Sequence, residues 1–317
     1  MELRRVRTES GLETQKHSDG QWLPLDGETP LGPSPLSDDW QLATADRHLQ
    51  QTGSLLPFAP LSFRDFLVSE QHNVNARRGL VKRFYPGTYR MTRAIETGTH
   101  QTYPGFKPEK LFYQEPIYYF GNAMTVVPTG TPIAFPSSSH GLDFELELAW
   151  ALNAPLYNAS AGEATAAIGA FVLLNDFSAR DVQRAEMGSG LGPLKTKHFI
   201  SSVSPTAVTA DEILPRLDQL TGSVIINGRT VSTVSTRGLQ WTRARSWPTR
   251  HATSTCCLAR SSRPGHCPAA WGWKPATGSA AATTSSSPWT ASAKSNTTSS
   301  RPETTSGPSQ EINCHVR

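Results

Sequence analysis

The chain has 317 residues, a formal net charge of +4 and 37% hydrophobic residues, enough for one large domain or two small ones. Residues 242–317 hold nine Lys or Arg against two Glu, which leaves residues 1–241 with a net charge of −3. The positive charge therefore gives no support for nucleic-acid binding by the body of the chain. No apolar run approaches the roughly 20 residues that span a bilayer, and the N-terminus lacks the pattern of a signal peptide. A cytoplasmic protein without a membrane partner is expected.

The C-terminal part of the chain differs in composition from the rest. Residues 242–317 are rich in Ser, Thr, Ala, Pro and Arg, and hold one Leu, one Ile, one Val and no Phe, Tyr or Met. This composition predicts a disordered tail. Cysteines occur only in this tail, at Cys256, Cys257, Cys267 and Cys314, and their spacing matches no zinc site.

The N-terminal part is predicted to be mobile. Residues 1–54 are polar and rich in Gly, Pro and Asp, without sustained periodicity. A helix is then predicted from Ser62 to about Phe84, with Ser62 or Asp65 as its N-cap and Gly79 as an interruption or end. Residues 101–138, rich in aromatic residues and Pro, are expected to form short strands and loops around a pocket.

Acidic and apolar residues alternate between Leu142 and Leu148. On a strand the apolar side chains would pack inward, while Asp143, Glu145 and Glu147 share the other face. Side chains two positions apart on a strand are roughly 6.6 Å apart, so these carboxylates repel one another unless they face water or share a cation. Two interpretations stay open: an edge strand with a solvated acidic face, or a site for a hard cation.

A buried strand is predicted over residues 166–174, which are almost all apolar. Asp176 or Ser178 could cap a helix that follows it, and this helix would place Arg180 and Gln183 on one face. Farther on, residues 223–231 predict a β-hairpin with a type I′ turn at Asn227-Gly228.

Four segments in this order resemble the fumarylacetoacetate hydrolase family over roughly residues 55–241. They are Asp65 to His72, the strand with Glu145 and Glu147, Asn175 to Gln183, and Lys197 before a His and an aromatic residue. Members of the family place an aspartate seven residues before a catalytic histidine, then Glu-x-Glu, then Asn-Asp-x-Ser-Ala-Arg-Asp-x-Gln, then a lysine. The resemblance implies a catalytic domain over residues 55–241 with an α+β, mostly β fold, a mixed β-roll that is incomplete at the C-terminus.

The resemblance also implies a role for each matching residue. It gives a Mg²⁺ or Ca²⁺ ion four ligands, Asp65, Glu145, Glu147 and Asp176. It assigns four catalytic residues: His72, the general base that activates water, and Arg180, Gln183 and Lys197. It gives the substrate three contacts, Tyr119, Arg180 and Gln183. The cation would polarise the carbonyl under attack, and a side-chain cation would stabilise the enolate that leaves.

The activity implied is hydrolysis of a carbon–carbon bond in a β-diketo acid, similar to fumarylacetoacetate or an acylpyruvate, as in the catabolism of aromatic amino acids. A homodimer with no nucleic-acid partner is expected. Three departures bear on the substrate: Leu67 and Met187 replace tyrosines of fumarylacetoacetases, and Asn75 replaces a glutamate that acylpyruvate-cleaving relatives often carry three residues after the histidine. Residues 1–54 also look too short and too polar for the small N-terminal β-domain of those enzymes.

Other functions stay open at this point. A metal-dependent decarboxylase of an oxaloacetate-like β-keto acid would need the same cation but no hydrolytic water. An inactive truncated remnant or a binding protein would lack a metal site. Nucleic-acid binding through the basic tail is the most distant alternative.

The resemblance stops after Trp241, and a shifted reading frame would continue it. Starting each codon at its third base, residues 263–273 permit Thr-Gly-Thr-Leu-Pro-Gly-Gly-Met-Gly-Met, and residues 289–295 permit Asp-Gly-Ile-Gly-Glu-Ile. Both stretches resemble the family. The hypothesis is a single-base slip or missed splice site at about residues 241–244, which makes the tail an out-of-frame translation.

Overall fold

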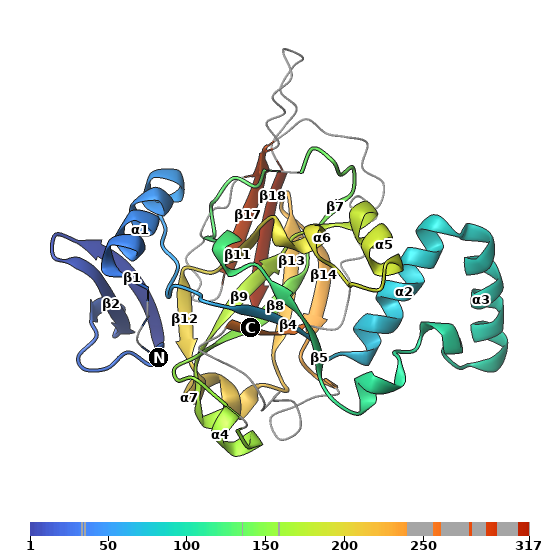
Figure 1. Ribbon diagram of the computed structural model, residues 1–317, viewed down its shortest axis with the longest axis horizontal. Helices are drawn as coiled ribbons and strands as arrows, with labels where there is room; N and C mark the ends of the chain where they lie inside the picture. Colours follow the sequence, from blue (N-terminus) through green and yellow to red (C-terminus); the bar gives the residue numbers. More distant parts are fainter. Residues whose placement is uncertain are drawn as a thin grey trace, which may run out of the picture.

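The computed structural model describes residues 1–239 except 33, 35, 135 and 158, and beyond them the backbone of four strands at 256–260, 279–280, 290–296 and 310–316. Within these residues the architecture is α+β and mostly β, as the sequence predicted (Figure 1).

One large sheet forms the centre of the molecule. Its path runs in the order β3-β2-β1-β12-β9-β8-β15-β4-β5, and β11 joins it by pairing with β9 and β6. Its strands are β1 (Glu2–Thr8), β2 (Gly11–Ser18), β3 (Gln21–Pro24), β4 (Phe63–Leu67), β5 (Ile117–Gly121), β6 (Val126–Pro128), β8 (Leu146–Leu152), β9 (Ile168–Asp176), β11 (Ser201–Val203), β12 (Thr206–Thr209) and β15 (Cys256–Arg260). Both of its faces are covered at the centre, because β8 and β9 are buried along their whole lengths.

A second sheet has the order β14-β13-β18-β17-β16. Its strands are β13 (Thr221–Ile226), β14 (Arg229–Ser235), β16 (Ser279–Ala280), β17 (Thr290–Asn296) and β18 (Gln310–Val316), and a separate short pair joins β7 (Leu142–Asp143) to β10 (Ser178–Ala179). One hydrophobic cluster contains Leu148 and Phe171 of the large sheet together with Val224 and Val234 of the second. Apolar packing between β8–β9 and β13–β14 therefore joins the two sheets.

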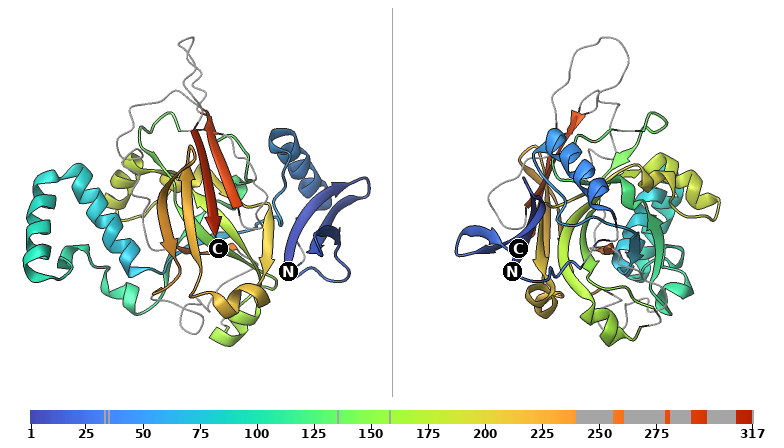
Figure 2. Two further views of the ribbon diagram at one scale, coloured as in Figure 1. Left: turned by 180° about the vertical axis from the view of Figure 1, so that it is seen from behind. Right: turned by 60° about the vertical axis from the view of Figure 1, so that its left-hand side comes forward.

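The helices lie around these sheets. They are α1 (Asp38–Thr52), α2 (Glu70–Phe84), α3 (Pro86–Thr99), α4 (Ala161–Ala166), α5 (Arg180–Gly188), α6 (Lys195–His198) and α7 (Ala210–Ile213), with short 3-10 turns at Pro104–Phe106, Lys110–Tyr113, Ala123–Thr125 and Leu214–Arg216. Helices α2 and α3 extend together away from the sheets, on the side opposite β1 and α1 (Figures 1 and 2). Among the described residues, none of the helices is both long and apolar enough to cross a membrane.

The prediction of a mobile segment over residues 1–54 is wrong, and so is the expectation that no small N-terminal β-unit would fit. β1, β2 and β3 form an antiparallel meander, and β1 pairs with β12 of the large sheet. Backbone hydrogen bonds hold these strands, so they need little apolar periodicity, and Leu3 alone among their residues is fully buried. Asp19-Gly20, with positive φ angles of 49° and 79°, is the two-residue hairpin turn that joins β2 to β3.

The predicted helix from Ser62 is also wrong over its first residues. Phe63–Leu67 is strand β4, which pairs with β5 and β15, and α2 begins only at Glu70. The N-cap is Ser69, whose hydroxyl accepts a hydrogen bond from the His72 backbone N–H. Gly79 lies inside α2 and is buried, so it neither interrupts nor ends the helix.

Other predicted elements are found close to their expected places. The buried strand is β9, and the hairpin is β13–β14, with positive φ angles at Asn227 and Gly228. The helix after β9 is α5, but Ala179 occupies its N-cap, so neither Asp176 nor Ser178 caps it. The disorder predicted for residues 242–317, and their frame, concern a part of the chain that lies outside the described residues apart from four strands, so both stay predictions.

Candidate metal centre

Three carboxylates converge on the large sheet from three different strands. Asp65 on β4, Glu147 on β8 and Asp176 at the end of β9 each offer one oxygen, and these oxygens lie within 4.8 Å of one another. All three residues are buried, with exposures of 1%, 1% and 0%. The order β9-β8-β15-β4 brings the strands together, and Figure 1 shows them in the middle of the molecule.

This cluster fits a hard divalent cation. Ionised carboxylates that are buried together repel one another and are costly unless a positive charge compensates them. Carboxylate oxygens are the ligands that Mg²⁺, Ca²⁺ and Mn²⁺ prefer. The interpretation of the acidic strand as a solvated edge is wrong, because Asp143, Glu145 and Glu147 are buried and β8 lies between β9 and β15.

Glu145, the fourth expected ligand, lies beside the cluster and faces two cations. Its Oε2 accepts a hydrogen bond of 2.5 Å from Lys197 Nζ, and its Oε1 accepts one of 2.6 Å from Arg180 Nη2. Lys197 Nζ also donates to Asp176 Oδ2. The Lys197 ammonium, 2% exposed, thus bridges Glu145 and the three-carboxylate cluster.

Arg180 extends this arrangement of charges. Its Nε donates to Asp143 Oδ2 at 2.6 Å, and its Nη1 donates to Gln183 Oε1 at 2.8 Å. Burial by itself would lower the pKa of Arg180, but the carboxylates of Glu145 and Asp143 raise it above its ordinary value. Two carboxylates of the acidic segment therefore share one guanidinium group, and Gln183 lies beside it on the face of α5 that the sequence predicted.

Tyr119 reaches the cluster from β5. The register of the sheet places Tyr119 opposite Asp65, and its hydroxyl donates to Asp176 Oδ2 at 2.9 Å. Ser201 Oγ donates to the other oxygen of Asp176 at 3.4 Å. Both oxygens of Asp176 are thus oriented by neighbouring side chains, as is common for metal-binding carboxylates.

The loop before the acidic strand is fastened to α5. The Asp181 carboxylate accepts hydrogen bonds from Ser139 Oγ at 2.5 Å and from the His140 backbone N–H at 2.8 Å. Burial opposes ionisation of Asp181, but these donors hold its pKa below the ordinary value. The Arg180 N–H donates to the Gly141 carbonyl at 2.8 Å. The first turn of α5 therefore aligns the segment that carries Asp143 and Glu145.

Glu186, near the end of α5, positions α6. Its carboxylate accepts hydrogen bonds from the backbone N–H groups of Leu194, Lys195 and Thr196, at 2.8, 2.9 and 3.2 Å. These are donors that a short helix otherwise leaves unsatisfied at its N-terminus. Glu186 thereby fixes the helix that presents Lys197 to Glu145 and Asp176.

His72 lies in the first turn of α2 and is buried, with 3% exposure. Helix α2 begins three residues after β4, the strand that carries Asp65. The Ser69 cap fixes this first turn. A connection of only two residues, Val68 and Ser69, therefore joins the strand that carries Asp65 to the helix that carries His72.

The motif predicted the carboxylates, Tyr119, Lys197, Arg180 and Gln183, and the structure brings these residues together. Sequence reasoning gave no role to Asp143 beyond its place in the acidic segment, and it missed Glu186 entirely. The two-residue spacing of Asp143 from Glu145 was a usable signal. The contacts of Glu186 leave no mark in the local sequence pattern.

Comparison with known proteins shows a family match over part of the chain. Residues 96–247 match the family described as fumarylacetoacetate (FAA) hydrolase, C-terminal. Fumarylacetoacetase of Bos taurus is 37% identical over 120 residues, which cover 32% of this chain and 28% of that protein. Fumarylacetoacetase of Oryza sativa subsp. japonica is 34% identical over 124 residues, covering 33% and 28%. The chain thus spans 28% of the length of these curated relatives.

Solved structures share the fold. A 5-carboxymethyl-2-hydroxymuconate delta-isomerase from Mycobacterium smegmatis aligns with a TM-score of 0.56 at 17% identity, over 89% of this chain and 93% of that one. A fumarylacetoacetate hydrolase from Exiguobacterium antarcticum aligns with a TM-score of 0.56 at 12% identity, over 89% and 94%.

The fold and the clustered acidic residues define an α+β, mostly β protein with three buried carboxylates gathered on its large sheet. Over residues 96–247 the chain matches the fumarylacetoacetate hydrolase family. The matched segment includes Tyr119, the two glutamates, Asp176, Arg180, Gln183 and Lys197, whereas Asp65 and His72 precede it.

Proposed function

We propose that this protein is a divalent-metal-dependent hydrolase that cleaves a carbon–carbon bond in a β-diketo acid similar to fumarylacetoacetate or an acylpyruvate. The observation that supports the proposal is the buried cluster of Asp65, Glu147 and Asp176 beside Lys197 and Arg180. Fumarylacetoacetase is also the name of the curated relatives that the chain resembles.

In this proposal Asp65, Glu147 and Asp176 hold Mg²⁺, Ca²⁺ or a similar cation, and Glu145 is the fourth ligand. When bound, the cation supplies Lewis-acid polarisation of the substrate carbonyl. Glu145 also anchors Lys197 and Arg180, so a change at Glu145 would disturb two cations as well as the metal.

Charge stabilisation of the leaving group falls to Lys197 and Arg180. Breaking the carbon–carbon bond leaves an enolate, and a fixed cation near its oxygen lowers the barrier more than solvent does. Lys197 is kept in place by Glu145 and Asp176, and Arg180 by Asp143 and the same Glu145. The Tyr119 hydroxyl and the Gln183 amide supply hydrogen bonds to the polar groups of the substrate.

His72 is the proposed general base, which takes a proton from the attacking water at an imidazole nitrogen. Histidine is the side chain that most often serves as a general base in enzymes.

The test is to follow the loss of β-diketo absorbance with fumarylacetoacetate and with acylpyruvates, in Mg²⁺, Mn²⁺ and Ca²⁺. We expect turnover that stops with chelation and falls at least roughly 10²-fold in His72→Asn and in Glu147→Gln. A folded protein that binds Mn²⁺ but leaves every such substrate intact would overturn the assignment. Release of CO₂ from oxaloacetate that persists in His72→Asn would instead identify a decarboxylase. The homodimer, the cytoplasmic location and the role in aromatic amino acid catabolism stay predictions.

A further inference from the structure

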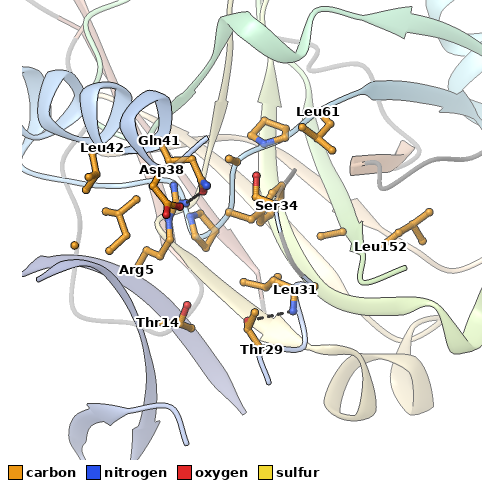
Figure 3. A pocket seen from close by; sticks show the side chains of 18 of the residues that line it. Arg5, Thr14, Thr29, Leu31, Ser34, Asp38, Gln41, Leu42, Leu61 and Leu152 are labelled. Carbon is orange, nitrogen blue, oxygen red and sulfur yellow. Dashed lines mark hydrogen bonds between the residues drawn. The ribbon is translucent and has the colours of Figure 1, made fainter. Parts of the chain in front are cut away.

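Two cavities away from the metal cluster meet at Arg5. One, of about 450 Å³, lies between β1, β2, the start of α1 and the end of β8. The other, of about 300 Å³, lies between α1, β6 and the segment after α6. Arg5 and Gln41 line both. Figure 3 shows the larger cavity, with Arg5 and Gln41 directed toward each other.

The smaller cavity has positively charged walls. Arg5 from β1 and Arg47 and His48 from α1 line it, and among the described residues that line it there is no Asp or Glu. Asp38 lines only the larger cavity. Neither cavity is lined by the three clustered carboxylates, by Tyr119 or by Lys197. The cavities are therefore separate from the proposed active site.

Arg5 has neutral acceptors instead of a carboxylate partner. Its Nε donates to the Leu56 carbonyl at 3.0 Å, and its Nη1 donates to Gln41 Oε1 at 3.4 Å. Burial lowers the pKa of Arg5 to about 10. Within the described residues neither Arg5 nor Arg47 forms an ion pair. Arg47 is exposed, whereas Arg5 is poorly solvated. Such a guanidinium group is usually paired with an anion, and the protein residues that line the smaller cavity supply none for Arg5.

His48 is the second observation that points to a ligand. Its side chain is buried, with 4% exposure, it lines the smaller cavity, and its ring makes no hydrogen bond within the part of the chain that is described. Burial, together with the Arg47 and Arg5 charges, lowers the pKa of His48 to about 4. The neutral ring thus offers one N–H donor toward the cavity at neutral pH.

The remaining walls are largely apolar and include Trp40, Leu56, Val126 and Ile200. Such a lining suits an anion with an apolar body better than inorganic phosphate. From this geometry we infer a binding site for a small organic carboxylate, whose carboxylate group lies between Arg5, Arg47 and His48 and whose hydrocarbon part fills the space between α1 and β6.

The experiment uses the full chain, benzoate as the probe and benzamide as its neutral analogue of similar shape. The His48 ring signal is followed by NMR and assigned with His48→Gln. Benzoate should shift this signal and raise the pKa of His48, and benzamide should do neither. Arg47→Met should weaken benzoate binding roughly tenfold, as expected for loss of one charge-assisted contact. Arg4→Met is the matched control, since Arg4 is on the same strand and lines neither cavity.

Arg5→Met should also weaken benzoate binding. If that variant fails to fold, Arg5→Lys keeps the charge and should retain part of the affinity. No change at His48 with millimolar benzoate would overturn the inference. Equal binding of benzamide would do the same, since the cavity would then be selecting an apolar ring. Binding of phosphate as tightly as benzoate would overturn the assignment of an organic ligand.

Discussion

Charges alternate along the line of side chains from Asp143 to Asp176. Arg180 lies between Asp143 and Glu145, and Lys197 lies between Glu145 and Asp176. Each link is a buried or partly buried ion pair, so removing one member leaves its neighbour with an uncompensated charge. Residues of different elements therefore depend on one another for their geometry, and substitutions along this line should not be additive.

Asp143→Asn should loosen Arg180 but leave the three clustered carboxylates in place. The amide keeps the shape but removes the charge that Arg180 Nε contacts at 2.6 Å. We expect the free energy of unfolding to fall by about 1–3 kcal/mol and turnover to fall as well. Urea unfolding measures the first effect. The control is Asp46→Asn, whose exposed ion pair with Arg7 should contribute under about 1 kcal/mol; equal effects of the two changes would contradict the argument.

Tyr119→Phe should weaken metal binding. The phenol orients Asp176 Oδ2 through a 2.9 Å hydrogen bond, and loss of such an orienting contact lowers metal affinity roughly 10- to 100-fold. Calorimetric titration with Mn²⁺ measures the change. Tyr118→Phe alters the neighbouring residue, which packs against Phe66 and Phe120 instead, and it should leave the affinity unchanged. Similar affinities for all three proteins would show that the Tyr119 hydroxyl does not orient the ligand.

At the scale of elements, α5 and α6 form a unit that delivers two cations to the acidic cluster. Glu186→Ala removes three hydrogen bonds at the start of α6, and we expect a loss of about 0.5–2 kcal/mol, as for a helix cap. Turnover should fall further than stability suggests, because Lys197 loses its fixed position. Glu115→Ala, at an exposed glutamate, is the control. Unchanged turnover in Glu186→Ala would show that the position of α6 does not affect the reaction.

The same carboxylate gives a pH dependence with a definite sign. Burial opposes ionisation of Glu186, but the backbone donors of Leu194, Thr196 and Lys195 lower its pKa below 4.5. Its contribution to stability is therefore complete above about pH 4.5 and is lost as pH falls through the lower folded pKa. Unfolding measured from about pH 3 to about pH 7 should show less acid dependence in Glu186→Gln than in the parent chain. Identical profiles would contradict the assignment.

The segment around Pro30 packs against β9 of the large sheet at Gly169. A substitution at Gly169 tests this packing. A Cβ added at Gly169 would lie 1.6 Å from the Pro30 carbonyl oxygen. Gly169→Ala should destabilise the protein by about 1–3 kcal/mol, measured by thermal unfolding. Gly188→Ala is the control, because a Cβ there meets nothing within 4 Å and alanine favours helix. Equal stability of both variants would indicate that residues near Pro30 do not pack on β9.

These elements also show how far the sequence could predict the fold. β9 and the Asn227-Gly228 hairpin were predictable, because an apolar run and a turn dipeptide are local signals. Phe63–Leu67 carries no alternation, and its strand is determined by pairing with β5 and β15, distant in sequence. The site follows the same rule: the acidic residues stand in a recognisable motif, whereas the contact of Arg180 with Asp143 spans 37 residues and that of Lys197 with Glu145 spans 52.

At the scale of the whole molecule, the cluster depends on a strand from the C-terminal part of the chain. β15 pairs with β4 and with β8, the strands that carry Asp65 and Glu147. Its registers place position 258 opposite Asp65 and position 260 opposite Glu147. This pairing places β15 between the strands that carry two of the three carboxylates.

The frame-shift hypothesis is tested by sequencing the transcript across codons 236–302. We expect the alternative frame to join after Trp241, because the family-like stretches at 263–273 and 289–295 share that frame. A chain in the restored frame should unfold at a higher temperature, since apolar side chains would add about 25 cal/mol for each Å² buried. At that rate, burial of roughly 200–600 Å² of apolar surface would equal a net stability of roughly 5–15 kcal/mol. A transcript that matches the printed frame, with equal stability of the two chains, would refute the hypothesis and leave the metal cluster on the sheet as it stands.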